Sequence, residues 1–353
     1  MIVRRGTGDL NRIYRPCRID EIFGNEIAKR LIKNALEQGT VPQVYLLTGP
    51  SGCGKTTAAR VVAMYLNCRG TGEKPCCECP SCRSILNLNS FAVMEIDASR
   101  TSSVDVIRSA LDDLPAASLG GERYKVLVID EAHNLSGKAE DALLKFMEDT
   151  PPDIHIILCT NEPQKLKAVT INRCKQVQFG RLTDNEIYNL LEQVSQFEGF
   201  DYKKDILQFI AEEVEGVPRA ALSALQMIST EGSWTKENAT VIINSGVDIE
   251  NADVFAFCKT LLKGNWSEVK ESFLKIKALP AETIRLTICG FLAGCVRNAR
   301  TYEAAELYAD MVEKMSYLYY GPKPVNILFA KICMLMGMIR KANAMNASGG
   351  YRR

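Results

Sequence analysis

The sequence predicts an α/β domain, with a parallel sheet covered by helices, followed by a small helical lid and an all-helical collar. Three observations support this fold class. A glycine-rich string near residue 50 joins a strand-like run to a helix-like run, strand-like and helical runs alternate up to about residue 180, and the rest reads as purely helical. Alternation of this kind is typical of parallel sheets with helical crossovers. The 353 residues suffice for two or three domains.

Five short apolar runs are the expected strands of the sheet. They are Val44–Leu47, Val93–Ile96, Val126–Ile129, Ile154–Cys159 and Gln176–Phe179. Val44–Leu47 and Val126–Ile129 are continuous apolar runs, which indicate buried strands. We therefore assign residues 1–180 to the α/β domain, with a cysteine-rich insertion at 68–82.

The helical part begins at a clear start signal. Thr183 and Glu186 have the spacing of a capping box, flanked by the apolar residues Leu182 and Ile187. We assign 181–243 to the lid, 244–345 to the collar and 346–353 to a frayed tail. The expected collar helices are Ala252–Leu262, Trp266–Ala278, Ala281–Asn298, Glu303–Tyr319 and Val325–Ala344.

The glycine-rich string fits the phosphate-binding pattern G-x-x-x-x-G-K-[ST]. In this pattern, glycines let successive backbone N–H groups point at phosphate oxygens, and the following helix adds its positive end. Lys55 is expected to reach the terminal phosphates and Thr56 to bind Mg²⁺. The nucleotide-binding candidates here are Gly49, Pro50, Ser51, Gly52, Cys53, Gly54, Lys55, Thr56 and Thr57.

Polar residues that follow two of the expected strands complete a site for ATP hydrolysis. Asp130 is expected to hold Mg²⁺, and Glu131 to orient and deprotonate the attacking water. Asn161, after the next strand along the chain, is our candidate for sensing the terminal phosphate. His133 is expected to be structural, since Glu131 already fills the water-activating role.

Two arginines are candidates for contacts with the phosphates. Arg173 lies at the expected domain edge, where it could reach a nucleotide bound by a neighbouring subunit. Arg219 begins a lid helix and could clamp the phosphates from above. For both residues, the alternative is an ordinary surface arginine.

A cysteine cluster follows the phosphate-loop helix. Cys76, Cys79 and Cys82 have C-x₂-C-x₂-C spacing, and Cys68 would supply a fourth thiolate. Four thiolates suit a closed tetrahedral Zn²⁺ site, whose role would be structural. Cys77 could replace Cys76 as a ligand. Unligated cytosolic thiols and an iron–sulfur site are the alternatives.

Composition excludes a strongly basic or membrane-spanning protein. Net charge is +1, so nucleic-acid contacts would need a local basic surface. The most apolar stretch, Val325 to Ile339, is interrupted by polar residues and too short to span a bilayer. The N-terminus lacks an apolar signal core, and the thirteen cysteines suit a reducing compartment. We expect a cytoplasmic protein with no membrane partner.

Several motifs occur in one order that resembles the ATPase subunit of the bacterial sliding-clamp loader, the gamma/tau subunit family of DNA polymerase III. The resemblance covers residues 10 to about 225 and is closest in these segments: Tyr14-Arg15-Pro16, Ile22–Glu26, the phosphate loop, the cysteine cluster, Glu95–Ser102, Asp130–Ser136, Ala142–Glu148 and Pro163–Leu166.

The resemblance implies an AAA+ module whose subunits assemble into a five-membered open spiral. ATP would lie between one subunit and Arg173 of the next. ATP binding would open the sliding clamp, primer–template DNA would complete the sites, and hydrolysis would release both. The family's DNA-facing positions correspond to Arg100, Arg108 and Lys145, while Tyr14 and Pro16 would pack near the adenine.

Departures from the family pattern leave other interpretations open. Asn172 replaces the usual serine before the arginine finger, Asn25 replaces a glutamine, and Asn161 stands where the family usually has threonine. A diverged or phage-encoded relative of the short gamma form would fit. The alternatives are a nonhydrolysing stator of the delta-prime type, another AAA+ motor such as a branch-migration motor, and a redox-sensing ATPase.

Overall fold

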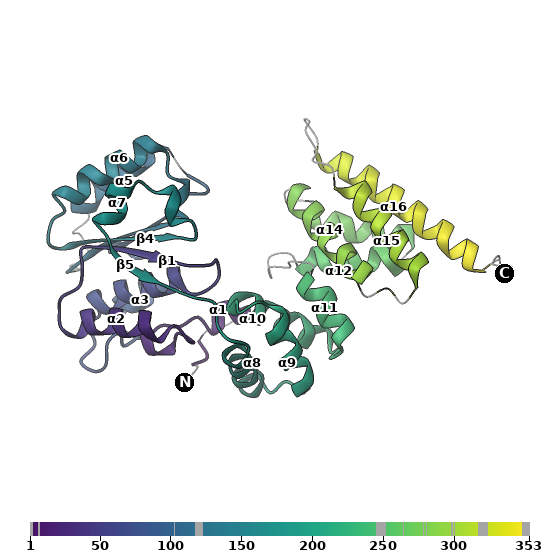
Figure 1. Cartoon of the computed structure of the whole chain (residues 1–353), viewed down its shortest axis with the longest axis horizontal. Coiled ribbons are helices and arrows are strands. Elements are labelled where there is room, and N and C mark those ends of the chain that lie inside the picture. The colour runs from purple at the N-terminus through teal and green to yellow at the C-terminus, as the bar shows by residue number, and fades with distance from the viewer. Residues whose placement is uncertain are drawn as a thin grey trace. The chain divides into compact units, whose positions relative to one another are not determined.

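The computed structural model shows a five-stranded parallel sheet followed by helices (Figure 1). It describes residues 3–5, 8–101, 103–116, 123–244, 252–263, 265–277, 279, 281–297, 299, 301–316 and 324–347. The chain divides into two compact units, the first comprising 1–8, 12–190 and 215–219, the second 9–11, 191–214 and 220–353. The division into 1–180, 181–243 and 244–345 stays a prediction. Residues 245–251 and the tail beyond 347 lie outside the described residues.

The five predicted strands are confirmed, with ends that differ by about one residue. The strands are β1 (Val44–Thr48), β2 (Val93–Asp97), β3 (Lys125–Asp130), β4 (Ile154–Thr160) and β5 (Lys175–Gln178). Their order in the sheet is β2-β3-β4-β1-β5, and every neighbouring pair is parallel. β3 and β4 are almost fully buried, as expected for central strands covered on both faces.

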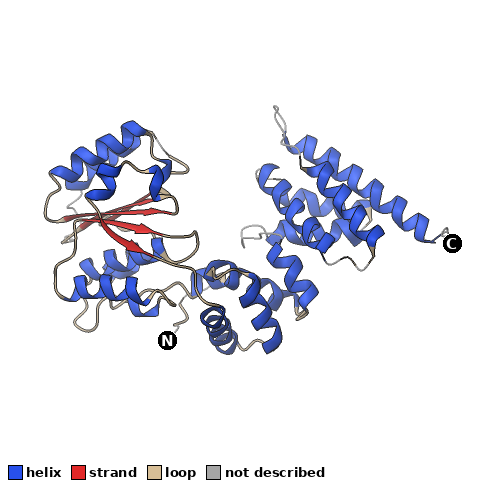
Figure 2. Cartoon of the chain, viewed as in Figure 1, coloured by secondary structure: helices blue, strands red, loops and turns tan. Residues whose placement is uncertain are grey.

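Helices cover both faces of the sheet in the first unit (Figures 1 and 2). One core cluster includes side chains of α2 (Glu26–Glu37) and α3 (Lys55–Asn67), and the other includes side chains of α5 (Val104–Ala116) and α6 (Gly137–Glu148). α2 is amphipathic: Ala28, Ile32 and Leu36, spaced by four, are its buried residues.

Shorter elements complete this unit. They are α1 (Leu10–Ile13), α4 (Pro80–Leu86), α7 (Ala168–Asn172) and the 3₁₀ turns η1 (Ile19–Glu21), η3 (Ala132–Asn134) and η4 (Pro163–Lys165). The predicted capping box at the start of α8 (Asp184–Glu198) is confirmed: the Glu186 N–H donates to Thr183 Oγ1, and the Thr183 N–H donates to Glu186 Oε2.

The second unit is helical throughout its described part (Figure 2). The helices that lie wholly or mostly in this unit are α9 (Lys204–Glu213), α10 (Pro218–Glu231), α11 (Lys236–Asn244), α12 (Ala252–Lys263), α13 (Trp266–Ile276), α14 (Ala281–Arg297), α15 (Tyr302–Met315) and α16 (Pro324–Ala347). The helices from α12 onward closely match the predicted collar helices, although residues 317–319 of the fourth predicted helix lie outside the described residues. Aromatic contacts join α12, α13 and α16: Phe273 meets Phe257 edge-to-face and Phe329 at a tilt. No described helix is both long and apolar enough to cross a bilayer.

Candidate functional site

The phosphate-binding loop lies at the carboxyl edge of the sheet, between β1 and α3. Its backbone is unusual: Gly49 has φ +140° and Gly52 has φ +77°, values that favour glycine. A Cβ at Gly49 would lie 2.1 Å from the Phe179 carbonyl oxygen, so the loop tolerates no side chain there. The backbone shape that the motif predicted is therefore present.

Lys55 is held inside this loop. Its side chain is almost fully buried, and its Nζ donates to the carbonyl oxygens of Gly49 (2.8 Å) and Pro50 (2.9 Å). The ammonium is thus held within the phosphate-binding loop, and its contact with the terminal phosphates stays a prediction.

Thr56 and Asp130 come together from different elements. Thr56 Oγ1, in the first turn of α3, donates a 2.6 Å hydrogen bond to Asp130 Oδ2 at the end of β3. The other Asp130 oxygen accepts from the Glu131 N–H at 3.0 Å. A hydroxyl and a carboxylate oxygen are hard ligands that fit Mg²⁺, which usually keeps several waters and binds few protein groups.

Glu131 begins a tight turn directly after β3. Its backbone is left-handed (φ +49°, ψ +42°), and its carboxylate lies near His133, with Oε2 3.5 Å from Nδ1. The side chain is partly exposed, so water can reach it. This arrangement suits a carboxylate that orients an attacking water.

Thr160 is a site residue that our sequence reasoning missed. It is fully buried at the end of β4, opposite Thr48 in the β1 register, and its carbonyl accepts the Gly49 N–H at 3.1 Å. The predicted sensor Asn161 is the next residue and is exposed. A polar residue ending an apolar strand was the available signal. The phosphate-sensing role of Asn161 stays a prediction.

Arg219 lies beside the phosphate loop. A Cβ at Gly52 would be 3.3 Å from the Arg219 Cβ and 2.8 Å from Val217 Cγ1. The structure therefore brings this arginine close to the loop, and its contact with the phosphates stays a prediction.

The segment that carries Tyr14 and Pro16 runs into the same region. Tyr14 is buried and Pro16 is half-buried, and Ile22, a few residues on, would lie 3.8 Å from a Cβ at Gly54. Cys17 and Ile22 share a core cluster with Cys53 of the loop. The proposed adenine contacts of Tyr14 and Pro16 stay predictions.

Arg173 is exposed at the end of α7, and its guanidinium donates to Glu148 Oε1 of α6 at 2.7 Å. α7 is also fixed to α6 by buried Glu140, whose Oε1 accepts from Thr170 Oγ1 (2.6 Å) and from the Lys167 N–H (2.8 Å). The arginine thus stands on an anchored helix, and its own chain pairs it with an exposed carboxylate.

The three predicted DNA-binding residues are all exposed. Arg108 of α5 and Lys145 of α6, together with Lys138, line a hollow of about 810 Å³ between these helices. Asp112, Asp141 and Asp149 line it too, so its charge is mixed. Arg100 is highly exposed, and its Nε lies 3.6 Å from Oδ2 of Asp97. Asp97 is the last residue of β2, at the carboxyl edge of the sheet.

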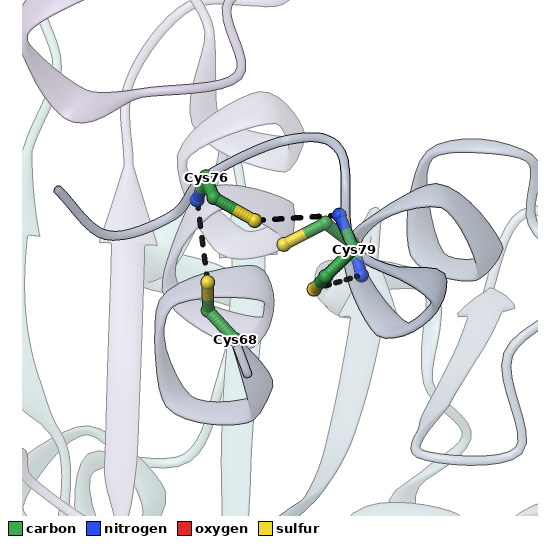
Figure 3. A group of neighbouring side chains, drawn as sticks. Cys68, Cys76 and Cys79 are labelled. Carbon is green, nitrogen blue, oxygen red and sulfur yellow. Dashed lines mark hydrogen bonds between the residues drawn. The ribbon is translucent and has the colours of Figure 1, made fainter. Parts of the chain in front are cut away.

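Four cysteines converge as the spacing predicted. The sulfurs of Cys68, Cys76, Cys79 and Cys82 all lie within 4.8 Å of one another. Backbone N–H groups donate to them: Cys76 N to Cys68 Sγ and Cys79 N to Cys76 Sγ, each at 3.3 Å (Figure 3). Four sulfurs in one cluster are a donor set that fits a closed Zn²⁺ site.

Cys77 points elsewhere, so the four-sulfur cluster forms without it. Its Sγ lies 3.7 Å from the Cys17 carbonyl oxygen and 3.5 Å from that of Pro75. The backbone of Cys77 is left-handed (φ +63°), which turns its side chain away from its neighbours' sulfurs.

The thiolate form is favoured at two ligands. Backbone hydrogen bonds from Glu78 and Cys79 lower the pKa of Cys76 to about 6. Burial raises the pKa of Cys79, but hydrogen bonds from the Cys82 and Arg69 backbones outweigh it, and the net pKa is lowered. Burial raises the pKa of Cys82, whose thiolate therefore needs a cation to form.

The fold and these residues define a protein of the P-loop nucleotide-binding class with a cysteine-cluster insertion. Residues 24–183 match the family described as "DNA polymerase III, delta subunit". The chain is 37% identical over 240 residues to the DNA polymerase III subunit tau of Bacillus subtilis. The aligned region covers 67% of this chain and 42% of that protein. It is 28% identical to the tau/gamma subunit of Haemophilus influenzae, over 96% of this chain and 49% of that protein.

The chain therefore belongs to the DNA polymerase III tau/gamma family. It spans about half or less of the length of these relatives. Protein STICHEL of Arabidopsis thaliana is also 32% identical over 67% of the chain and 19% of its own length. Among solved structures, the branch migration motor RuvB of Thermotoga maritima aligns with a TM-score of 0.48 and 21% identity, over 70% of this chain and 79% of that one. That likeness is too weak to separate one function from another.

Proposed function

We propose that this chain is the ATP-hydrolysing subunit of a sliding-clamp loader. The observation that carries the proposal is the Thr56–Asp130 hydrogen bond beside Lys55 and Glu131, on a chain related to tau/gamma subunits. Lys55 would bind the terminal phosphates and Thr56 and Asp130 would hold Mg²⁺, which neutralises phosphate charge. Glu131 would orient and deprotonate the water. We also expect the protein to act in the cytoplasm, where replication takes place.

Hydrolysis would be completed by a neighbouring subunit. Arg173 is exposed on an anchored helix and pairs with exposed Glu148, an ion pair that costs little to exchange for a phosphate. Arginine at a transferring phosphoryl group stabilises the charge of the transition state. Arg219, beside the phosphate loop, would contact the same phosphates within the chain. This arrangement would couple hydrolysis to assembly in a five-membered spiral.

DNA would be bound through its backbone. Arg100, Arg108 and Lys145 are exposed, and two of them line the same hollow between α5 and α6. Phosphate contacts position a duplex without reading its sequence, as a protein that acts at any primer–template junction requires. ATP-bound subunits would hold the open clamp around this DNA, and hydrolysis would release both. The cysteine cluster would hold Zn²⁺ as a structural clip.

Two other functions are distinguishable. A nonhydrolysing stator would not need the Lys55, Thr56 and Asp130 arrangement that this chain has. Another AAA+ motor would assemble as a hexamer, which a native mass measurement would reveal. Neither alternative accounts for both the intact phosphate site and the tau/gamma relatives.

The test is an ATPase assay of the reconstituted complex, with and without sliding clamp and primed DNA. We expect stimulation by clamp and primed DNA, and loss of that stimulation in Arg173→Ala with nucleotide binding intact. Lys175→Ala is the matched control, because Lys175 is an exposed cation only two residues further on. A wild-type complex that ignores ATP would disprove the proposal.

A further inference from the structure

His133 lies between the candidate general base and the phosphate loop. Its side chain, on η3, is only 8% exposed. Its Nδ1 is 3.1 Å from Thr160 Oγ1 and 3.5 Å from Glu131 Oε2, and its Nε2 is 3.5 Å from Glu162 Oε1. Both ring nitrogens therefore face oxygen atoms in a largely closed space.

Thr160 connects this ring to the loop. Its hydroxyl accepts the Glu162 N–H at 3.0 Å, and its backbone carbonyl accepts the Gly49 N–H at 3.1 Å. Gly49 begins the phosphate loop, so a backbone hydrogen bond ties the start of the loop to Thr160. The chain of contacts therefore runs from Gly49 through Thr160 and the His133 imidazole to Glu131.

We propose that His133 is a positioning residue that orients the Glu131 carboxylate and links it to the phosphate loop through Thr160. The inference rests on the proposed ATPase function and deepens it. A proton on Nδ1 faces both Thr160 Oγ1 and Glu131 Oε2, and the shorter distance is to Thr160. The Glu131 carboxylate therefore lies beside the ring through Oε2, and its other oxygen is left to engage water.

A purely structural histidine would fill the same space, so the test must separate packing from positioning. His133→Phe keeps the ring volume and removes both nitrogens. His133→Asn keeps a polar group near the Nδ1 position, and His133→Gln keeps one near the Nε2 position. His155→Gln is the control, because His155 is the chain's other histidine and bonds to the Pro42 carbonyl instead.

The reconstituted complex, with clamp and primed DNA, provides the first readout. We expect His133→Phe to lower kcat about tenfold or more while the Kd for ATP changes little, since orientation of a general base acts on the chemical step. His133→Asn should recover more activity than His133→Gln. In a Glu131→Gln background, His133→Phe should cause no further loss, because it acts through Glu131. A wild-type kcat in His133→Phe would overturn the inference. So would a loss of kcat from His133→Phe that is as large in the Glu131→Gln protein as in the wild-type protein.

A second readout does not depend on hydrolysis. The ring resonances of His133 in the isolated full chain should shift when Mg²⁺ and ADP bind, while those of His155 stay in place. An unmoved His133 signal in a chain that binds the nucleotide would overturn the inference. If the complex hydrolyses no ATP, the proposed function fails, and this measurement still decides the link between His133 and the loop. If His133→Phe does not fold, the comparison of His133→Asn with His133→Gln decides, and equal kcat values would count against it.

Discussion

Thr56 donates a 2.6 Å hydrogen bond to Asp130, which joins the first turn of α3 to the end of β3. The two residues are far apart in the sequence, and parallel strands bring them to one edge of the sheet. In open α/β sheets, ligands bind at this carboxyl edge. The bond therefore marks where a metal-bound nucleotide would be held.

We expect Asp130→Asn to reduce ATP hydrolysis on the order of 100-fold, because a neutral amide holds Mg²⁺ less well. Binding of Mg²⁺-ATP, measured against ATP without metal, should lose its metal dependence. Asp97→Asn is the matched control: Asp97 is the register partner of Asp130 on β2 and hydrogen-bonds Ser99. Equal effects of the two substitutions would contradict the metal-binding role.

Gly49→Ala should destabilise the first unit by about 2 kcal/mol or more, because overpacking against fixed backbone is costly. The new Cβ would meet the Phe179 carbonyl oxygen at 2.1 Å, and the position has φ +140°. Nucleotide binding should be lost as well. Gly137→Ala is the control, since a Cβ at Gly137 meets nothing within 4 Å. Thermal unfolding and nucleotide titration provide the measurements, and wild-type behaviour of Gly49→Ala would contradict this geometry.

Cys76→Ser should abolish zinc binding, whereas Cys77→Ser should leave one bound zinc. Cys76 is in the four-sulfur cluster, and Cys77 instead contacts the Cys17 and Pro75 carbonyls. Since a structural zinc site stabilises the fold around it, Cys76→Ser should also unfold at a lower temperature. Metal analysis of the purified variants checks both. The reverse pattern would show that Cys77 is the ligand.

Acidification should destabilise the protein through His155. Burial lowers the pKa of this histidine below its usual value near 6.5, although its ring donates to the Pro42 carbonyl. The unfolded chain therefore takes up the proton first as pH falls. The contribution of neutral His155 to the free energy of unfolding is fully present above pH 6.5, and it is lost as pH falls through the folded-state pKa of His155. His155→Gln should flatten this part of the profile of unfolding free energy between pH 8 and pH 5, and an unchanged profile would contradict the assignment.

The strands, helices and phosphate loop were predictable because their signals are local. β3 and β4 are mainly apolar, and α2 repeats its buried residues every four positions. The Thr183–Glu186 capping box also lies within one turn. In each case a short window of sequence contains the physical cause.

Contacts that depend on strand register were not predictable. Thr160 meets His133 because β3 and β4 pair with a particular offset, which no local pattern specifies. The Arg173–Glu148 pair depends on how α7 packs against α6. Cys77 was ambiguous in sequence, and its left-handed backbone decides its direction.

DNA affinity should depend on Arg108 and Lys145 through phosphate contacts alone. Each substitution to alanine should weaken binding of primed DNA equally for unrelated sequences and reduce the salt slope by about 1. Both residues line the hollow between α5 and α6, where aspartates share the surface. Lys165→Ala is the control, because Lys165 is exposed and pairs with Glu162. Binding by the reconstituted complex at several salt concentrations checks this. A sequence-dependent loss would mean that these side chains contact bases, and an unchanged slope would place the DNA elsewhere.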